Sequence, residues 1–419
     1  MEFFSNLLTY FLLLLVPIYC VYRISRNKYI ALLNPSLHLV FWAYIYFTVP
    51  VLFMKSYSLY NFFDFSDHIY TSTDFLCNWY VIVFLIFYMI STDHNIEVVN
   101  YRPKITTYHL ALFFSFAISV FFIFLIGKFG PTLLSLLDRG SALSFFSDKI
   151  FFGYKFGLFF NIFLGAVAVI LWRTRNPLWL LMFLLPISID LLAKGRTIAW
   201  SCMLFAYLNY VVIFRKTAFK IAIPLFLGLV FGGFLRYQEY NWNQGIDKIF
   251  IDLFSDPIVN RFSTPLVYKD HFGEGNLFSY FIFSFFKILP ESFTRSLFDY
   301  NNSAQVSLGH ILTQDYGRKL GYSISVNIVG EALYYGGITF AIISPLLIGL
   351  IIYSLYDFRI YRNFPGFIFV CIVISGLRGT MRGTFYDTFM PAVYLMFSYL
   401  IWITILEWKS VVFRFKNNS

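Results

Sequence analysis

A carboxylate stands inside one of the most apolar stretches of this sequence. The segment ISVNIVGEALYYGGITFAIISPLLIGL, residues 324–350, places Glu331 one to two helical turns inside a run long enough to cross a membrane. A charged side chain there is costly unless it faces water or a partner. If the run is helical, polar residues line one face of it: Asn327, Glu331, Tyr334 and Tyr335. A carboxylate on such a face could pair with an arginine, bind a sugar hydroxyl or act as a general base.

Glycines accompany this polar face. Gly330, Gly336 and Gly337 remove side chains near Glu331, so that another backbone or a ligand could approach closely. Much of the remaining chain is interpreted as a scaffold for the polar face.

Three arginines are candidates for binding an anion. Arg196 lies in LLAKGRTIAW, a tight glycine-containing turn in which Thr197 could cap the next helix. A guanidinium beside a helix N-terminus favours phosphate, although Arg196 could instead extend to the membrane interface. Arg378 and Arg382 in GLRGTMRGTFYD share a face if helical, or join backbone amides if the segment is a turn.

Three further residues are weaker candidates. Arg139 could simply pair with Asp138, and Arg236 could be an interfacial side chain at a helix end. His310, in SLGHILTQDYGRK, could contact a hydroxyl or be a solvated loop histidine. The six histidines show no metal-ligand spacing, and the sequence lacks nucleotide-binding and serine-hydrolase motifs.

Composition identifies the elements that must position these residues. The chain has 419 residues, of which 59% are hydrophobic and only 13% charged, with a mean hydropathy of +0.68. A soluble domain carries roughly 25% charged residues, so we expect an all-α polytopic membrane protein. The net charge of +10 is explained by basic loops on the cytoplasmic side, without nucleic acid as a partner.

Hydropathy predicts about eleven transmembrane helices, with a range of ten to twelve, in a single integral membrane domain covering residues 1–419. The predicted spans lie near 3–22, 37–54, 75–92, 108–127, 152–172, 178–193, 198–214, 219–235, 326–355, 366–378 and 388–406. Basic loops then place the N-terminus outside and the C-terminus in the cytoplasm.

The longest connection, residues 236–325, falls on the outer, periplasmic side of this topology. Charged residues such as Arg261 punctuate its short apolar groups, which predicts amphipathic helices lying on or near the membrane interface. The run at 277–290 is interpreted as interfacial or re-entrant, because it has about fourteen residues and contains Lys287. If that run crossed the membrane, Glu331 would move to the cytoplasmic side.

Two segments carry a resemblance to a known family. Together, SVNIVGEALYYGGITFAIISPLLIGL and LLAKGRTIAW resemble the O-antigen and capsule repeat-unit polymerases of the Wzy type. That family is similar in having a Gly-Glu-x-x-Tyr-like start to a late span after a long periplasmic loop, and an arginine at a mid-chain turn. The resemblance covers most of the chain in hydropathy and these two patches in residues.

The resemblance implies an enzyme of the bacterial inner membrane with its active site facing the periplasm. Such an enzyme joins undecaprenyl-pyrophosphate-linked oligosaccharide repeat units by inverting glycosyl transfer, without metal or cofactor. A chain-length regulator and a flippase are further candidate partners, beside the lipid bilayer. On this chain, the acceptor hydroxyl would be oriented or deprotonated by Glu331 or His310. Pyrophosphate and sugar would be bound by Arg196, Arg378, Arg382, Arg139, Arg236, Tyr334 and Tyr335.

Three other functions remain open at this stage. An O-antigen ligase would use similar chemistry, with greater weight on a histidine in the long outer loop. A polysaccharide flippase or other transporter would favour polar residues at the membrane midplane and an internal repeat, neither of which the sequence shows. A membrane O-acyltransferase would need a histidine within a span and an acyl-carrier entrance on the cytoplasmic side.

Overall fold

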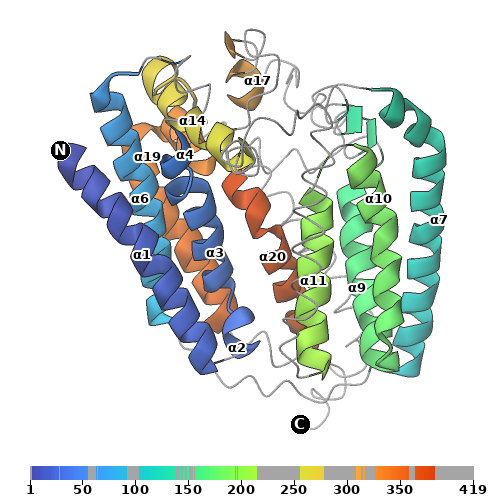
Figure 1. Ribbon diagram of the computed structural model, residues 1–419. Helices are drawn as coiled ribbons and strands as arrows, with labels where there is room; N and C mark the ends of the chain where they lie inside the picture. Colours follow the sequence, from blue (N-terminus) through green and yellow to red (C-terminus); the bar gives the residue numbers. More distant parts are fainter. Residues whose placement is uncertain are drawn as a thin grey trace, which may run out of the picture. The chain divides into compact units, whose positions relative to one another are not determined.

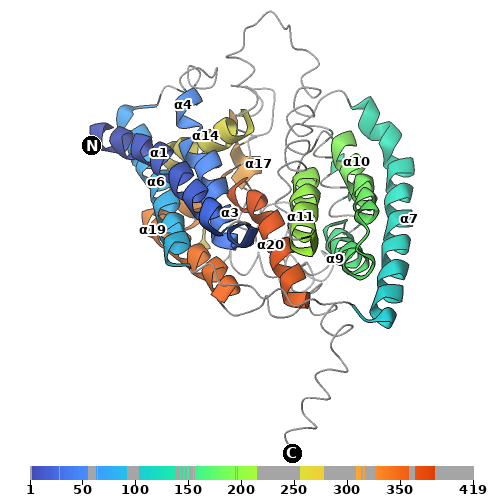
Figure 2. The same ribbon diagram turned by 60° about the horizontal axis from the view of Figure 1, so that its bottom comes forward.

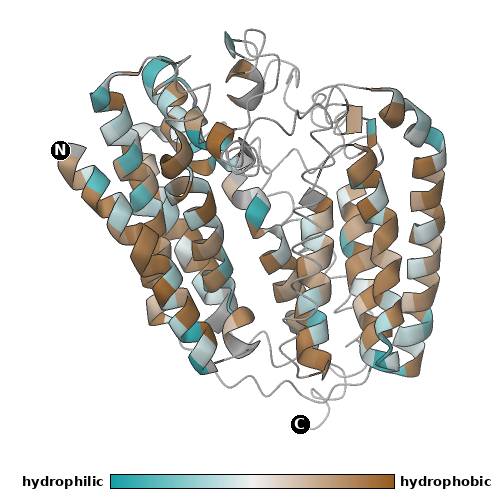
Figure 3. Cartoon of the chain, viewed as in Figure 1, coloured by the Kyte–Doolittle hydropathy of each residue, from teal (hydrophilic) through white to brown (hydrophobic). Residues whose placement is uncertain are grey.

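The computed structural model describes most of the chain at the level of backbone and side chains. The described residues are 2–27, 29–54, 63, 65–91, 103–136, 142, 145–146, 149–150, 154, 156–193, 195, 197–214, 255–277, 308–312, 315–316, 326–357 and 364–382. They form helices joined by turns and contain no strand. Figure 1 shows these helices coloured by their position in the sequence, and Figure 3 shows that most of their residues are hydrophobic.

The described helices confirm a polytopic α-helical membrane protein. Six of them are long and apolar enough to cross a membrane: Phe3–Arg26, Pro35–Met54, Asp67–Ile90, Ile105–Ser135, Phe156–Thr174 and Ile328–Ser354. Shorter apolar helices at Pro177–Leu192, Ile198–Phe214 and Gly366–Gly379 coincide with three more predicted spans. The predicted spans 219–235 and 388–406, like most of the run 277–290, lie outside the described residues.

The chain divides into two compact units. The first contains Met1–Asp93, Gly233–Asp357 and Leu377–Met390, and the second contains His94–Gly232, Phe358–Gly376 and Pro391–Ser419. Every described residue of the candidate site belongs to the first unit.

The first unit is built around α6 (Asp67–Ile90), which packs against α1 (Glu2–Asn27), α3 (Pro35–Ala43), α14 (Ser255–Asp270) and α19 (Ile328–Asp357). Figures 1 and 2 both show α1, α3, α6 and α19 side by side. The unit also contains α2 (Tyr29–Leu32), the π-helical turn η1 (Tyr44–Thr48), α4 (Val51–Met54) and α17 (Leu308–Leu312). A buried asparagine begins α3: the side chain of Asn34 accepts from the amide of Ser36 and donates to Ser91 Oγ at 2.8 Å.

Helix α14 differs from the amphipathic interfacial helix expected in the long connection. Its residues from Pro257 to Val267 are buried, with the exception of the half-buried Val259. It packs against α19, α6 and η1. Its polar residues therefore face other helices, and hydropathy alone does not distinguish such a helix from one whose polar face meets water.

Helix α19 is interrupted one-third of the way along its length. Gly337 has φ 61° and ψ −158°, which no helical residue adopts and which essentially only glycine tolerates. The carbonyls of Leu333 and Tyr334 accept hydrogen bonds from the amides of Gly273 and Gly275, at 3.2 and 2.9 Å. Residues 328–336 therefore form a short half-helix. The turn that follows α14 donates hydrogen bonds to carbonyls in the last turn of this half-helix.

Replacing Gly337 by alanine is expected to destabilise the protein by about 1–3 kcal/mol, because a Cβ strains this backbone conformation whatever the surrounding space. Thermal unfolding of the purified protein in detergent measures the effect. Gly127→Ala is the matched control: Gly127 is helical and has no atom within 4 Å of an added Cβ. A Gly337→Ala protein that melts with the control would contradict the interruption.

The second unit contains α7 (Ile105–Ser135), α9 (Phe156–Thr174), η3 (Pro177–Phe183), α10 (Leu184–Leu192), α11 (Thr197–Phe214) and the first part of α20 (Phe364–Arg382). Asp190 organises the turn between α10 and α11. Its carboxylate accepts from the amide of Ala199 at 3.0 Å, and its carbonyl accepts from Gly195 at 2.7 Å. A Cβ on Gly195 would lie 2.1 Å from Asp190 Oδ1, so the turn requires glycine there.

Candidate functional site

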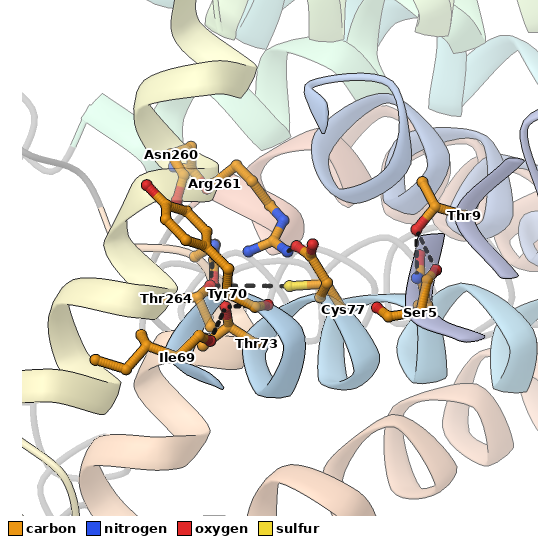
Figure 4. A network of polar contacts seen from close by, with 12 residues as sticks. Ser5, Thr9, Ile69, Tyr70, Thr73, Cys77, Asn260, Arg261 and Thr264 are labelled. Atoms are coloured by element: carbon orange, nitrogen blue, oxygen red, sulfur yellow. Dashed lines mark hydrogen bonds and ion pairs between the residues drawn. The ribbon is translucent and has the colours of Figure 1, made fainter. Parts of the chain in front are cut away.

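A buried ion pair joins α14 to α6. Arg261 is 1% exposed, and its Nη2 contacts the carboxylate of Asp74, which is 16% exposed. Figure 4 shows Arg261 reaching from α14 toward α6 beside Thr264. Removing one partner of a buried pair costs roughly 3–5 kcal/mol, because the other charge is left uncompensated. The pair thus fixes α14 against a membrane-spanning helix.

Arg261 retains unused hydrogen-bonding capacity. A guanidinium carries five N–H donors, and its planar fork matches the oxygens of carboxylates and phosphates. Nε and Nη1 of Arg261 are buried, and no acceptor among the described residues lies within hydrogen-bond distance of either atom. Unpartnered donors inside a protein are expensive, and an anion would satisfy them.

Asn327 connects the start of α19 to α14. Its Oδ1 accepts from the amide of Gly330 at 2.8 Å, which makes Asn327 the N-cap of the half-helix. Its Nδ2 donates to the carbonyl of Asn260 and to Thr264 Oγ1, both at 2.8 Å, and its amide donates to Ser263 Oγ at 3.0 Å. Asn327 therefore bonds to the residues of α14 on either side of Arg261.

Glu331 lies one helical turn after Asn327. The amide of Glu331 donates to the carbonyl of Asn327 at 3.0 Å, and its side chain is 2% exposed. Its carboxylate lies within electrostatic range of the Tyr80 phenol on α6, and that phenol hydrogen-bonds to Ser344. Because Glu331 is in the first turn of α19, the helix dipole stabilises its negative charge.

Arg378 contributes a second buried guanidinium to the first unit. It lies near the end of α20, is 8% exposed and donates from Nε to the Tyr46 hydroxyl at 3.2 Å. Its Cζ lies 5.9 Å from the centre of the Trp42 ring. Tyr46 belongs to η1, so Arg378 is anchored on the same turn against which α14, the helix that carries Arg261, packs.

Tyr334 and Tyr335 end the half-helix, and both are half-buried. Their rings meet edge to face with centroids 4.7 Å apart. A Cβ on Gly275 would lie 2.7 Å from Tyr334 Cδ1 and 2.6 Å from Tyr335 Cδ1, so the turn after α14 packs tightly on both rings. The predicted polar face of α19 is thus covered by α14 at one end and by this turn at the other.

The same turn carries a histidine between two carboxylates. His271 Nδ1 lies 2.8 Å from Glu274 Oε2, and His271 Nε2 lies 3.0 Å from Asp315 Oδ2. The hydroxyl of Tyr316 donates a hydrogen bond to the carboxylate of Asp270. Burial first, then this hydrogen bond and the charges of Asp270 and Asp315, raise the pKa of Tyr316, which keeps its hydroxyl a donor at neutral pH.

The predicted site residues divide into three sets. Glu331, Tyr334, Tyr335 and Arg378 are described with their side chains and lie in the first unit. His310 and Arg382 belong to helices α17 and α20, but their side chains lie outside the described set. Arg139, Arg196 and Arg236 also lie outside it, so their predicted roles stay predictions. The described residues contain no group of three or more His, Cys, Asp and Glu that could hold a metal ion.

Sequence reasoning missed Arg261 and Asp74 as site residues. Arg261 was assigned to an amphipathic interfacial segment, and Asp74 lies one residue before the predicted span 75–92. The available signal was Asp74 itself, since a carboxylate in a membrane-spanning helix requires a cationic partner. That argument predicts a partner without identifying which of the 32 Lys and Arg residues it is.

The fold and the site define a class: a polytopic α-helical membrane protein with an Arg261–Asp74 ion pair, a second buried arginine and a buried glutamate on an interrupted helix. Comparison with protein-family models, with curated proteins and with solved structures finds no match for this chain.

Proposed function

We propose that this protein is a membrane-embedded glycosyltransferase that polymerises undecaprenyl-pyrophosphate-linked oligosaccharide repeat units at the periplasmic face of a bacterial inner membrane, for O-antigen or capsule synthesis. The observation that carries the proposal is Arg261, a buried guanidinium with two N–H groups that no described residue accepts. The sequence resemblance to Wzy-type polymerases supports the same function.

The buried arginine suits a pyrophosphate leaving group. When the bond between the anomeric carbon and the pyrophosphate oxygen breaks, negative charge develops on that oxygen. Preorganised donors in a site that excludes water stabilise such charge more strongly than water does, because they need no reorganisation. In this proposal Arg261 supplies Nε and Nη1 to the phosphate oxygens, while Nη2 remains on Asp74.

Glu331 is the proposed group for the acceptor. The acceptor hydroxyl forms the new bond to the anomeric carbon, and its proton passes to the Glu331 carboxylate as undecaprenyl pyrophosphate departs. General base catalysis of this kind contributes about 10²–10⁴-fold. In this proposal the sugars pack against Tyr334 and Tyr335, which are half-buried at the end of the same half-helix.

The remaining predicted residues complete the proposed site. Arg378, anchored on Tyr46, is a second pyrophosphate ligand. Arg196 and Arg382, with Arg139 and Arg236, retain the predicted role of binding pyrophosphate, and His310 is the alternative acceptor base.

Deletion of the gene tests the function through the length of the surface polysaccharide. A polymerase deletion leaves single repeat units on the cell surface, as one short band in a gel of lipopolysaccharide or capsule, and plasmid-borne wild type restores the ladder. Complete absence of polysaccharide from the lipid core would indicate a ligase or a flippase instead. A normal ladder lacking acetyl groups would indicate an acyltransferase. Either of these outcomes would overturn the proposal.

A transporter of lipid-linked saccharides is a second candidate, favoured by one observation. The interruption of α19 at Gly337 lies less than two helical turns after the buried carboxylate of Glu331, and interrupted helices form the substrate sites of many transporters. The location of lipid-linked repeat units in the deletion strain separates the two functions. Accumulation on the periplasmic face supports the polymerase, whereas accumulation on the cytoplasmic face supports the transporter.

A further inference from the structure

The half-helix 328–336 is held at both ends by one continuous piece of chain. At its N-terminal end, Asn327 bonds to Asn260, Ser263 and Thr264 of α14. At its C-terminal end, the carbonyls of Leu333 and Tyr334 accept from Gly273 and Gly275, in the turn directly after α14. We refer to residues 255–277 and 328–336 together as the α14–α19 block.

The interruption at Gly337 separates this block from the rest of α19. In an unbroken helix the carbonyls of Leu333 and Tyr334 would bond to residues 337 and 338. Here they also accept hydrogen bonds from the turn, so the end of the half-helix is bonded to the segment that directly follows α14. Phe272, in the same turn, lies 3.6 Å from the position a Cβ would take on Gly337, which places the turn directly over the interruption.

Two charged groups of the proposed site are carried by this block. Arg261 lies between Asn260 and Ser263 on α14, and Glu331 lies one turn after Asn327 on the half-helix. The bonds from Asn327 therefore connect the backbone beside Arg261 to the backbone of Glu331, through the carbonyl of Asn260 and the amide of Glu331. Asn327 touches neither the leaving group nor the acceptor in the proposed reaction.

We propose that Asn327 is a positioning residue, which makes the α14–α19 block one rigid body and so fixes the Glu331 carboxylate relative to the Arg261 guanidinium. The rigid block is a statement about the fold, and only its use in catalysis rests on the proposed function. Misplacement of a catalytic group by about 1 Å can cost 10²-fold in rate. A rigid block that fixes the distance between the leaving-group ligand and the general base would prevent such misplacement.

The chain offers a matched control in Asn34. This residue is also a buried N-cap asparagine that bonds to a second segment of chain, through its 2.8 Å contact to Ser91, but it begins a different helix, α3. The variants Asn327→Ser and Asn34→Ser each remove a side-chain amide and retain a hydroxyl that can cap the helix. Thr264→Val is a second test variant of similar volume that leaves the cap intact and removes two of the hydrogen bonds to α14.

Hydrogen exchange of the full-length protein in lipid nanodiscs, followed by mass spectrometry, tests the block without any substrate. In Asn327→Ser and Thr264→Val we expect exchange to increase at least tenfold in residues 328–336 and also in residues 271–277, at the opposite end of the half-helix. In Asn34→Ser both regions should exchange as in wild type. An increase confined to residues 328–331, or the same increase in Asn34→Ser, would overturn the rigid block.

Turnover tests the catalytic use of the block. With the single-repeat lipid from the deletion strain as substrate, Asn327→Ser should lower kcat about 10–100-fold with KM nearly unchanged, while Asn34→Ser keeps wild-type kcat. Wild-type kcat in Asn327→Ser would overturn the positioning role. Absence of turnover in the wild type would instead overturn the proposed function, and the exchange experiment would still decide whether the block exists.

Discussion

Arg261→Gln is expected to abolish polymer formation and to lower the free energy of unfolding by about 3–5 kcal/mol, because Asp74 is left as an uncompensated buried charge. Loss of stability alone would then explain loss of function. The double variant Asp74→Asn/Arg261→Gln separates the two effects. It replaces the ion pair by two neutral amides, and we expect it to recover most of the stability and none of the activity.

The double variant can separate the two effects because stability and activity depend on different atoms of Arg261. Stability depends on the contact between Nη2 and the Asp74 carboxylate, whereas pyrophosphate would bind Nε and Nη1, which no described residue accepts. Removing preorganised donors of this kind costs about 10²–10³-fold in rate. Asp74→Asn alone is the converse control: it keeps the guanidinium and should retain polymer formation at temperatures where the variant is folded.

Thermal unfolding in detergent and the polysaccharide ladder in the complemented deletion strain measure these two properties. A double variant that is folded and produces the wild-type ladder would show that Arg261 only neutralises Asp74. A double variant as unstable as Arg261→Gln would show that the ion pair is not the source of the instability.

Glu331→Gln is expected to have the second largest effect. The substitution keeps the shape of the side chain and removes the carboxylate that would take the acceptor proton, so the rate of polymerisation should fall about 10²–10⁴-fold. Stability should fall less than in Arg261→Gln, since the amide keeps the shape of the side chain and is cheaper to bury than a carboxylate.

Chain length in the complemented deletion strain and a melting curve measure this outcome. Single repeat units from a variant that melts with wild type would support the role of Glu331. Normal chains from the same variant would contradict it and would leave His310 as the predicted acceptor base. A large loss of stability would instead indicate that Glu331 is a structural anion.

Membrane architecture could be predicted from the sequence because lipid imposes one dominant rule. A helix that crosses about 30 Å of hydrocarbon needs roughly 20 apolar residues, and such runs are visible without knowledge of the packing. The helices Pro35–Met54, Phe156–Thr174 and Ile328–Ser354 follow the predicted ranges closely, whereas Asp67–Ile90 begins eight residues before its predicted span and Ile105–Ser135 ends eight residues after its predicted span. Helix α14 could not be predicted in this way, because its burial depends on which helices cover it.

The candidate site was predictable in part for a similar reason. Glu331 is conspicuous in the sequence because a carboxylate in an apolar run has a known cost. Arg261 lies in a polar connection, where arginines are common, and only its contact with Asp74 distinguishes it. The role of Asn327 also depends on tertiary contacts, since its bonds to Asn260 and Thr264 join positions more than sixty residues apart.

Reconstitution of the purified chain tests the central claim most directly. The protein is placed in lipid vesicles with undecaprenyl-pyrophosphate-linked single repeat units extracted from the deletion strain, and the products are separated by size and identified by mass spectrometry. The proposal predicts a ladder of two or more joined units, with one undecaprenyl pyrophosphate released for each new linkage, from wild type and not from Asp74→Asn/Arg261→Gln. Folded wild-type protein that leaves the single units unchanged, or a double variant that forms the ladder at the wild-type rate, would contradict it.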